Sequence, residues 1–169
     1  FNLKEYRYYS NDNRTINPDH HIPSTIAKEL ALYVVIYAPV QMAADLPENY
    51  EGHPAFQFIL DVPTDWEDTI VLNGEIGEYI TTVRKDIDSD DWYLGSITNE
   101  KPRSLIVDLS FLDDDLEYIA TIYKDPIFGG WKYKPEEVEI IKLQFDNTGQ
   151  YRIDLPAGGG QAIRFSPID

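Results

Sequence analysis

Cysteine is absent from this 169-residue sequence, and methionine occurs once, at Met42. Without thiols the chain cannot form disulfides, thiolate zinc sites or a cysteine nucleophile. Basic residues are also scarce: fourteen Lys and Arg stand against thirty Asp and Glu, which gives a formal net charge of -16. A field of that sign repels nucleic-acid phosphates and anionic membrane surfaces, so neither is expected as a partner.

Several sequence signals that usually mark a function are missing as well. No apolar run reaches the roughly 18–20 residues that a membrane-spanning helix needs. Phe1 opens a polar, aromatic segment without the basic start and apolar stretch of a signal peptide, and without an initiator Met, so we expect a piece or processed product of something longer. A nucleophile elbow, a phosphate-binding loop and zinc-ligand spacing are all absent, and the residues alone indicate no active site.

What the sequence does contain is a long series of short segments rich in β-branched and aromatic residues. Turn formers such as Asn73-Gly74 and Asn147-Thr148-Gly149 separate them. Short strands at this regular spacing predict an antiparallel sandwich or barrel. The expected strands are Thr69–Leu72, Tyr79–Lys85, Trp92–Thr98, Ser104–Leu109, Tyr118–Lys124, Val138–Phe145, Tyr151–Leu155 and Ala162–Phe165.

The segment from Pro23 to Tyr50 has a different texture and is expected to be helical. Ser24 or Thr25 can cap its start, and Leu30 to Val40 is apolar on every helical face, which is typical of an enclosed helix. Pro39 predicts a kink or break, followed by a second short turn through Val40 to Asp45. The cover of this helix would come from a part missing here, from another copy, or from heavy packing on the β segments.

After the long loop of residues 1–22 and the enclosed helix, we expect one more short helical piece. It covers His53 to Ile59, with Phe56 and Ile59 facing inward. Pro63-Thr64-Asp65-Trp66 reads as a linker turn into the β part.

Acidic residues and histidines are candidate metal ligands, but each group also has a purely structural interpretation. His20-His21 could bind a metal ion, although a solvated loop pair is favoured because no third ligand lies at helical spacing. Asp86, Asp88, Asp90 and Asp91 resemble a calcium loop, but the required glycine and final glutamate are missing, which favours an exposed hairpin turn. The sequence therefore predicts no metal site in this chain.

Two further groups could serve a sugar-processing site. Glu29 and Asp45 flank the enclosed helix and could line a pocket, although caps or ion pairs are favoured. Of the three tryptophans, Trp131 is the best candidate for stacking on a sugar ring, because Phe128-Gly129-Gly130-Trp131 lies in an expected loop. Packing of that ring in the core or as a loop plug remains the favoured alternative.

The sequence resembles the C-terminal end of glycoside hydrolase family 97 over nearly its whole length. The matching phrases are STIAKELALYVVIYAPVQMAADLPENY (Ser24–Tyr50), HPAFQFILDVPTDWEDT (His53–Thr69), GEIGEYITTVRK (Gly74–Lys85), WYLGSIT (Trp92–Thr98) and AGGGQAIRF (Ala157–Phe165). These are scaffold phrases rather than a catalytic signature.

The resemblance implies a mixed fold class: the terminal helical segment of a (β/α)8 barrel over residues 1–60, followed by an antiparallel β-sandwich domain over residues 61–169. It implies a parent that is an exo-acting α-glucosidase or α-galactosidase, calcium-dependent, and periplasmic or secreted. Its catalytic carboxylates and calcium ligands would lie upstream, so this chain alone would be inactive and bind no calcium. Its expected partners are the rest of the parent or another copy of the chain, with an oligosaccharide as the parent's substrate.

The same mapping places the first loop near the sugar-facing rim of the barrel. Asn13, His20 and His21 are therefore expected to approach substrate. The alternative is a stand-alone carbohydrate-binding or structural β module, against which the enclosed helix argues, because a free module would expose its apolar surface.

Overall fold

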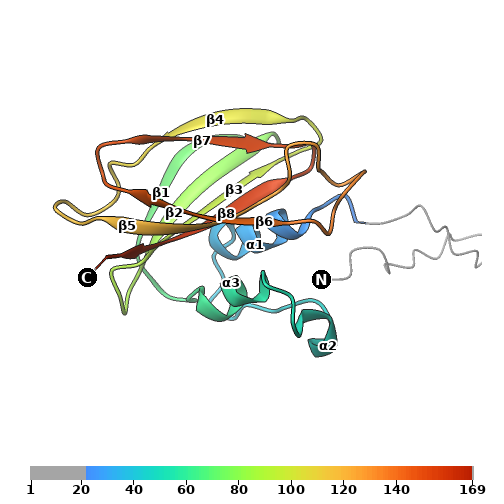
Figure 1. Ribbon diagram of the computed structural model, residues 1–169, viewed down its shortest axis with the longest axis horizontal. Helices are drawn as coiled ribbons and strands as arrows, with labels where there is room; N and C mark the ends of the chain where they lie inside the picture. Colours follow the sequence, from blue (N-terminus) through green and yellow to red (C-terminus); the bar gives the residue numbers. More distant parts are fainter. Residues whose placement is uncertain (1–21, 169) are drawn as a thin grey trace, which may run out of the picture.

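The computed structural model describes residues 22–168, which form a two-layer β-sandwich with helices on one side (Figure 1). The helices come first along the chain and all eight strands follow. The elements are α1 (Ile26–Val35), α2 (Pro47–Tyr50), α3 (Phe56–Asp61), β1 (Trp66–Glu75), β2 (Tyr79–Asp86), β3 (Trp92–Thr98), β4 (Arg103–Asp108), β5 (Tyr118–Lys124), β6 (Glu139–Phe145), β7 (Gln150–Leu155) and β8 (Gly160–Pro167).

Six strands form a large antiparallel sheet in the order β1-β2-β3-β8-β5-β6, and β4 and β7 form a two-stranded sheet. Figure 1 shows β4 and β7 covering one face of the large sheet, with α1 on the opposite face and α3 beyond it. The antiparallel sandwich is the architecture that the spacing of β-type segments predicts, and all eight expected strands are present. The Trp92–Thr98 and Tyr118–Lys124 strands have the predicted bounds.

The space between the two sheets is the larger hydrophobic core. Every second residue of a strand points to the same face, so Leu94, Ile163 and Phe165 of the large sheet all face β4 and β7. They pack there against Val107 and Ile153. Edge-to-face aromatic pairs reinforce this core, with Phe111 lying 5.6 Å from Phe165 between ring centroids.

The opposite face of the large sheet carries α1 on a floor of small residues. A Cβ added at Gly95 would lie 2.5 Å from the carbonyl oxygen of Ala31, and one at Gly160 would lie 2.5 Å from the Cα of Lys28. The helix therefore rests directly on the backbones of β3 and β8. Its buried residues Ile26, Leu30 and Val34 join Phe58 of α3 in a second core.

The enclosed-helix prediction holds for one face of α1 and is wrong in its extent. The helix is capped by Thr25, whose hydroxyl accepts from Lys28 N at 3.1 Å, as the sequence indicates. It ends at Val35, because Ile36 is already extended, well before Pro39. Residues 40–45 form no helical turn. The fully buried residue of α3 is Phe58, and Ile59 is partly buried against the same core, as predicted.

The β-sheet supplies one wall of α1, which is one of the three sources of cover that the sequence leaves open. The helix contacts β3 and β8 most, and β2 and β5 less. The chain after the helix stays uncovered: Ile36, Tyr37, Val40, Met42 and Leu46 are exposed. Among residues 22–168, no helix has the length and apolar character needed to cross a membrane.

Candidate functional site

Asn13, His20 and His21 lie outside the described residues, so their approach to substrate stays a prediction. The same holds for a His20-His21 metal pair. His53 is the histidine that the structure does describe. Its Nδ1 accepts from Ala55 N at 3.2 Å, and burial lowers the pKa of the imidazole. That geometry makes His53 a cap of the turn before α3.

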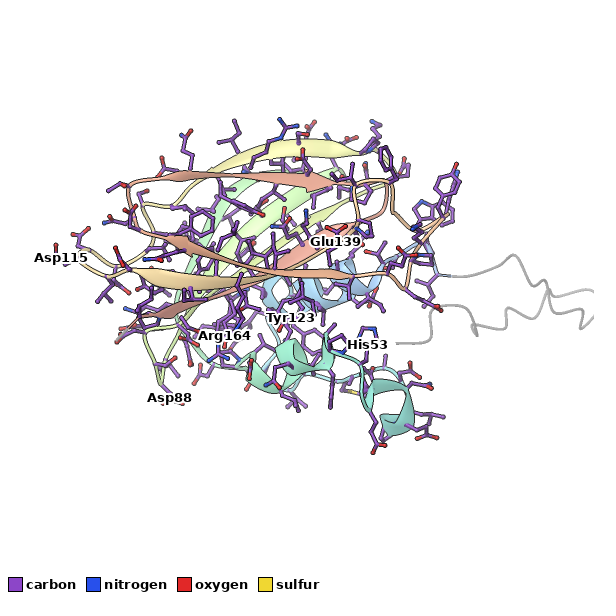
Figure 2. All side chains as sticks on the ribbon, viewed as in Figure 1. His53, Asp88, Asp115, Tyr123, Glu139 and Arg164 are labelled. Atoms are coloured by element: carbon purple, nitrogen blue, oxygen red, sulfur yellow. The ribbon has the colours of Figure 1, made fainter. Side chains whose placement is uncertain are left out.

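The acidic turn between β2 and β3 is a hairpin turn, as the sequence favours. Asp86 accepts from the backbone N of Asp88 at 3.2 Å and from the hydroxyl of Ser89 at 2.6 Å. Asp91 accepts from Arg164 Nε at 2.6 Å. Figure 2 shows Asp88 at the outer tip of this turn. Within residues 22–168, no three His, Asp or Glu side chains are placed to hold a metal ion, so these residues do not fit calcium.

The other candidate acids serve the fold locally. Asp45 accepts from Leu46 N at 2.8 Å and from the amide of Asn49 at 2.6 Å, which holds the start of α2. Glu29 accepts from the hydroxyl of Ser24 beside the cap of α1. Both acids make local hydrogen bonds near a helix start, but the cap of α1 is Thr25 and α2 has no side-chain cap.

Trp131 packs against the turn between β7 and β8. A Cβ added at Gly158 would lie 2.4 Å from the indole Cδ1, and the Lys132 ammonium lies 5.1 Å from the ring centroid. This contact favours a loop plug, while sugar stacking stays a prediction. Trp92 is buried and donates from Nε1 to Asp113 at 3.1 Å, and Trp66 packs edge-on to Tyr93, so neither is a sugar platform.

An open apolar feature lies on the side of the large sheet that carries α1. We call the exposed residues after α1 the helix-side surface; they are Ile36, Tyr37, Val40, Met42 and Leu46. On the same side, a groove of about 540 Å³ runs beside Lys28 and is lined by Val71, Ile76, Ile80 and Ile97. An apolar patch of this kind on a folded domain marks a contact surface.

One charged side chain, Arg84, holds the start of the helix-side surface on the sheet. Arg84 of β2 donates from Nε to the carbonyl of Val34 at 2.6 Å and from Nη1 to Thr69 Oγ1 at 2.8 Å. Its guanidinium lies 5.6 Å from the centroid of the Tyr37 ring. Arg84 thus satisfies a carbonyl at the helix end and contacts the ring of Tyr37, just beyond the helix.

A second ionic group fastens α3. Arg164 of β8 forms ion pairs with Asp61 of α3 at 2.7 Å and with Asp91 at 2.6 Å. Figure 2 shows Arg164 and Tyr123 on the face of the sheet toward α3. The helical segment is therefore held on the sheet by polar as well as apolar contacts.

Asp125, at the end of β5, joins the start of α1 to the start of β8. Its Oδ2 accepts from Thr25 Oγ1 at 3.0 Å and from Gly160 N at 2.8 Å. Its Oδ1 is buried without a hydrogen bond. Burial raises the pKa of Asp125 to about 6 despite these hydrogen bonds and the nearby Lys28.

Sequence reasoning missed Gly95, Gly160, Arg84 and Asp125, which together seat the helical segment. A glycine inside a strand signals close backbone approach, so Gly95 within WYLGSIT could have indicated the contact. Arg84 and Asp125 carry no such signal, because their partners are 50 and 100 residues away in sequence.

Comparison with known proteins places this arrangement in a family. The family model described as "Glycosyl-hydrolase 97 C-terminal, oligomerisation" matches residues 65–166. The retaining alpha-galactosidase of Bacteroides thetaiotaomicron is 41% identical over 144 residues, which cover 83% of this chain and 20% of that protein. The chain thus spans about a fifth of that relative's length.

Solved structures agree in fold. A glycoside hydrolase family 97 enzyme from Pseudoalteromonas sp. strain K8, in complex with acarbose, superposes with a TM-score of 0.86 at 44% identity, covering 88% of this chain and 23% of that one. A beta-arabinopyranosidase superposes with a TM-score of 0.69 at 26% identity, covering 91% of this chain and 23% of that one. Because the family model matches more than half of its length, this chain belongs to the glycosyl-hydrolase 97 C-terminal family.

Proposed function

We propose that this domain is the non-catalytic C-terminal part of an exo-acting α-glycosidase of family 97, an α-glucosidase or α-galactosidase that degrades oligosaccharides. In this proposal residues 1–60 form the last loop and helix of the (β/α)8 barrel, and residues 61–169 form the β-sandwich that supports it. The proposal is supported by the family of the β-sandwich and by the names of its relatives.

The observation that carries this function is the helix-side surface. Val40 and Met42 are 76% and 81% exposed, on a segment whose start is held by Arg84. A barrel seated there would cover this apolar chain and the groove beside Lys28. Burial of such side chains stabilises an interface by roughly 25 cal/mol per Å² of apolar surface.

The contacts of the described acids indicate that this domain has a structural role rather than a catalytic one. Glycoside hydrolysis uses two carboxylates that flank the scissile bond. Here the buried or half-buried acids hold structure: Asp91 pairs with Arg164, Asp113 holds Trp92, and Asp125 holds the start of α1. Catalysis and calcium binding are therefore assigned to the rest of the enzyme, and a periplasmic or secreted location is proposed from the family resemblance.

The proposal is tested with a chimaera. The 144 residues of the B. thetaiotaomicron retaining alpha-galactosidase that match this chain are replaced by this chain, and hydrolysis of an aryl α-galactoside is measured. We expect the chimaera to be active and the 169-residue chain alone to give no turnover on aryl α-galactosides or α-glucosides. Turnover by the chain alone would overturn the assignment of catalysis elsewhere.

A matched pair of variants tests the docking surface within the chimaera. Val40→Asp with Met42→Asp places two charges on the helix-side surface, while Ile106→Asp places one on the outward face of β4. A charge buried at an interface without a partner costs several kcal/mol, so the first variant is expected to lower the melting temperature and the activity. Equal behaviour of the two variants would show that the helix-side surface does not carry the barrel.

A further inference from the structure

The connection between β5 and β6 exposes three large apolar side chains, two of them aromatic. Ile127, Phe128 and Tyr133 are 75%, 88% and 80% exposed, and we call them the loop cluster. Figure 1 shows this connection at the end of the sandwich where β7 finishes. Single exposed apolar residues are ordinary, but three within one connection indicate a binding surface.

Hydrogen bonds and packing hold the backbone of this connection. Gly129 N donates to Pro126 O at 2.8 Å, and Ile26 N of α1 donates to Pro135 O at 2.9 Å. The ring of Trp131 packs against the turn between β7 and β8 and fills the space beneath the connection. The exposed side chains therefore project from an ordered backbone, which lowers the entropic cost of binding a ligand.

A groove of about 450 Å³ opens beside the loop cluster. Ile127 lines one side of it, and Pro102, Leu155 and Pro156 supply further apolar lining. Small-molecule sites in proteins commonly measure roughly 300–1,000 Å³, so the groove has the size of such a site. Because Phe128 follows Ile127 in the chain, its exposed side chain starts at the edge of this groove.

Polar side chains of β4 and β7 line another part of the groove: Ser104, Arg152 and Asp154. Arg152 donates from Nε to Asp154 Oδ1 at 3.0 Å and from Nη2 to Ser104 Oγ at 3.2 Å. The Ser104 hydroxyl also donates to Asp154. The side chains of Arg152 and Asp154 are nevertheless 67% and 54% exposed. These mutual contacts position the three side chains, and their exposed atoms can still donate to and accept from a ligand.

The charges at the groove cancel in pairs. Arg152 pairs with Asp154, and Arg103 pairs with Glu78. The groove therefore offers no excess of positive charge to an anion, and the net charge of -16 on the whole chain repels one. The cores of protein interfaces are depleted of charged residues, so two ion pairs here do not favour a protein partner.

A neutral ligand with both an apolar face and hydrogen-bonding groups fits these features. The ring of a sugar has C–H groups on its faces, which pack on the negative face of an aromatic ring such as Phe128. Its hydroxyls lie around the edge and both donate and accept, as the Arg152 and Asp154 side chains require.

We propose that this groove binds a neutral oligosaccharide, with one sugar ring packed on Phe128 and its hydroxyls hydrogen-bonded to Arg152 and Asp154. The site holds a sugar chain without cleaving it, so it is an accessory site separate from catalysis. The proposal assigns to Phe128 the stacking role that the sequence suggests for Trp131, whose ring packs against Gly158 instead. Only the choice of test sugars below rests on the proposed function.

Titration of the 169-residue chain with maltotetraose and with raffinose, followed by saturation-transfer NMR, tests the proposal. We expect at least one of these sugars to bind with a millimolar dissociation constant. Phe128→Ala and Asp154→Ala should each raise that constant about tenfold, because one removes the stacking ring and the other a charged hydrogen-bond acceptor. Ile87→Ala is the control, since it truncates an exposed apolar side chain at the other end of the sandwich and should bind like the parent chain.

Each other outcome overturns the proposal. Absence of binding for both sugars at about 10 mM excludes the site. Binding that survives Phe128→Ala or Asp154→Ala places the sugar outside this groove, and equal weakening by Ile87→Ala shows that the effect is not local. Protein association that is lost in Phe128→Ala, without sugar binding, would make the loop cluster a protein contact. Cleavage of either sugar by the chain alone would instead contradict the proposed function, and an inactive chimaera would leave this site untouched.

The absence of cysteine permits a second measurement, which locates the bound sugar directly. A nitroxide spin label is attached to Tyr133→Cys in the β5–β6 connection or, as the control, to Ile87→Cys in the turn between β2 and β3. The proposed site predicts that the label at 133 broadens the proton signals of the sugar and that the label at 87 does not. The reverse order would overturn the proposal even if the chain binds the sugar.

Discussion

The two faces of the six-stranded sheet are covered by opposite means. Toward β4 and β7 the sheet presents large side chains such as Leu94, Ile163 and Phe165, and the core is filled by their volume. Toward α1 it presents Gly95, Gly160 and Ala162, and the helix approaches the backbone itself. The sandwich face is therefore filled by large side chains, whereas the small residues of the other face let α1 pack against the strand backbones.

The half-buried Asp113 on the sandwich side and the buried Asp125 under α1 have pKa values shifted in opposite directions. Asp113 at the rim of the sandwich accepts from Trp92 Nε1 at 3.1 Å, Tyr118 Oη at 2.9 Å and Lys85 Nζ at 3.1 Å. Burial acts to raise the pKa of Asp113, but these hydrogen bonds outweigh it and lower the pKa. Asp125 under α1 has fewer donors, so burial dominates and its pKa is raised to about 6.

The largest effect is expected from removing volume on the sandwich face. Phe165→Ala should lower the free energy of unfolding by about 3–5 kcal/mol, because it deletes a fully buried ring and leaves a cavity. Urea denaturation followed by tryptophan fluorescence measures this loss. Ile106→Ala on the exposed face of β4 is the control and should change stability by less than about 0.5 kcal/mol. A small loss for Phe165→Ala would mean that this core can collapse around a cavity.

Adding volume on the helix face should have the next largest effect. In Gly95→Ala the new methyl group would lie 2.5 Å from the carbonyl of Ala31, so helix and sheet must separate, at a cost of about 1–3 kcal/mol. Gly149→Ala is the control, because its nearest neighbour, Leu109 Cδ1, lies at an ordinary 3.8 Å. If both substitutions had the same effect on the urea midpoint, the close contact between the α1 backbone and Gly95 would be refuted.

The last expected effect, similar in size to that of Gly95→Ala, is a pH dependence of opposite sign for the two acids. The raised pKa of Asp125 means that the folded state binds the proton more tightly, so its stabilising contribution is lost as pH rises through about 6. Asp125→Asn should therefore gain stability relative to the parent chain between pH values of about 4 and 7, by about 2–3 kcal/mol at 1.36 kcal/mol per pKa unit.

Asp113→Asn supplies the contrast. Because the pKa of Asp113 is lowered on folding, its contribution is present at neutral pH and is lost as pH falls below its ordinary value of 3.8. The stability deficit of Asp113→Asn should thus shrink with acidification. Urea titrations of both variants across pH measure the two slopes, and slopes of equal sign would contradict the comparison.

The sandwich face was predictable from sequence and the helix face was not. Alternation and turn residues located strands such as Tyr79–Lys85, which the structure extends by one residue to Asp86. Family resemblance identified the β domain, and the family model confirms it. The division at residues 60/61 and the barrel origin of the first part remain predictions.

The orientation of the helical segment on the sheet could not be predicted, because its sequence pattern does not distinguish a buried face from an exposed one. Leu30 to Val40 is apolar all round, so periodicity does not reveal which side meets the sheet. The end of α1 at Val35 reflects the extended conformation of Ile36, which precedes Pro39 and continues a run of β-branched residues. Long-range partners such as Arg84 with Val34, or Asp125 with Thr25, leave no local trace in the sequence.

The seat of α1 has a consequence for the order in which this chain can fold during synthesis. The helix rests on β3 and on β8, and β8 also joins β3 to β5 in the centre of the large sheet. Elements from opposite ends of the sequence must therefore meet before either is covered, and a helix made early waits with its apolar face exposed until β8 leaves the ribosome.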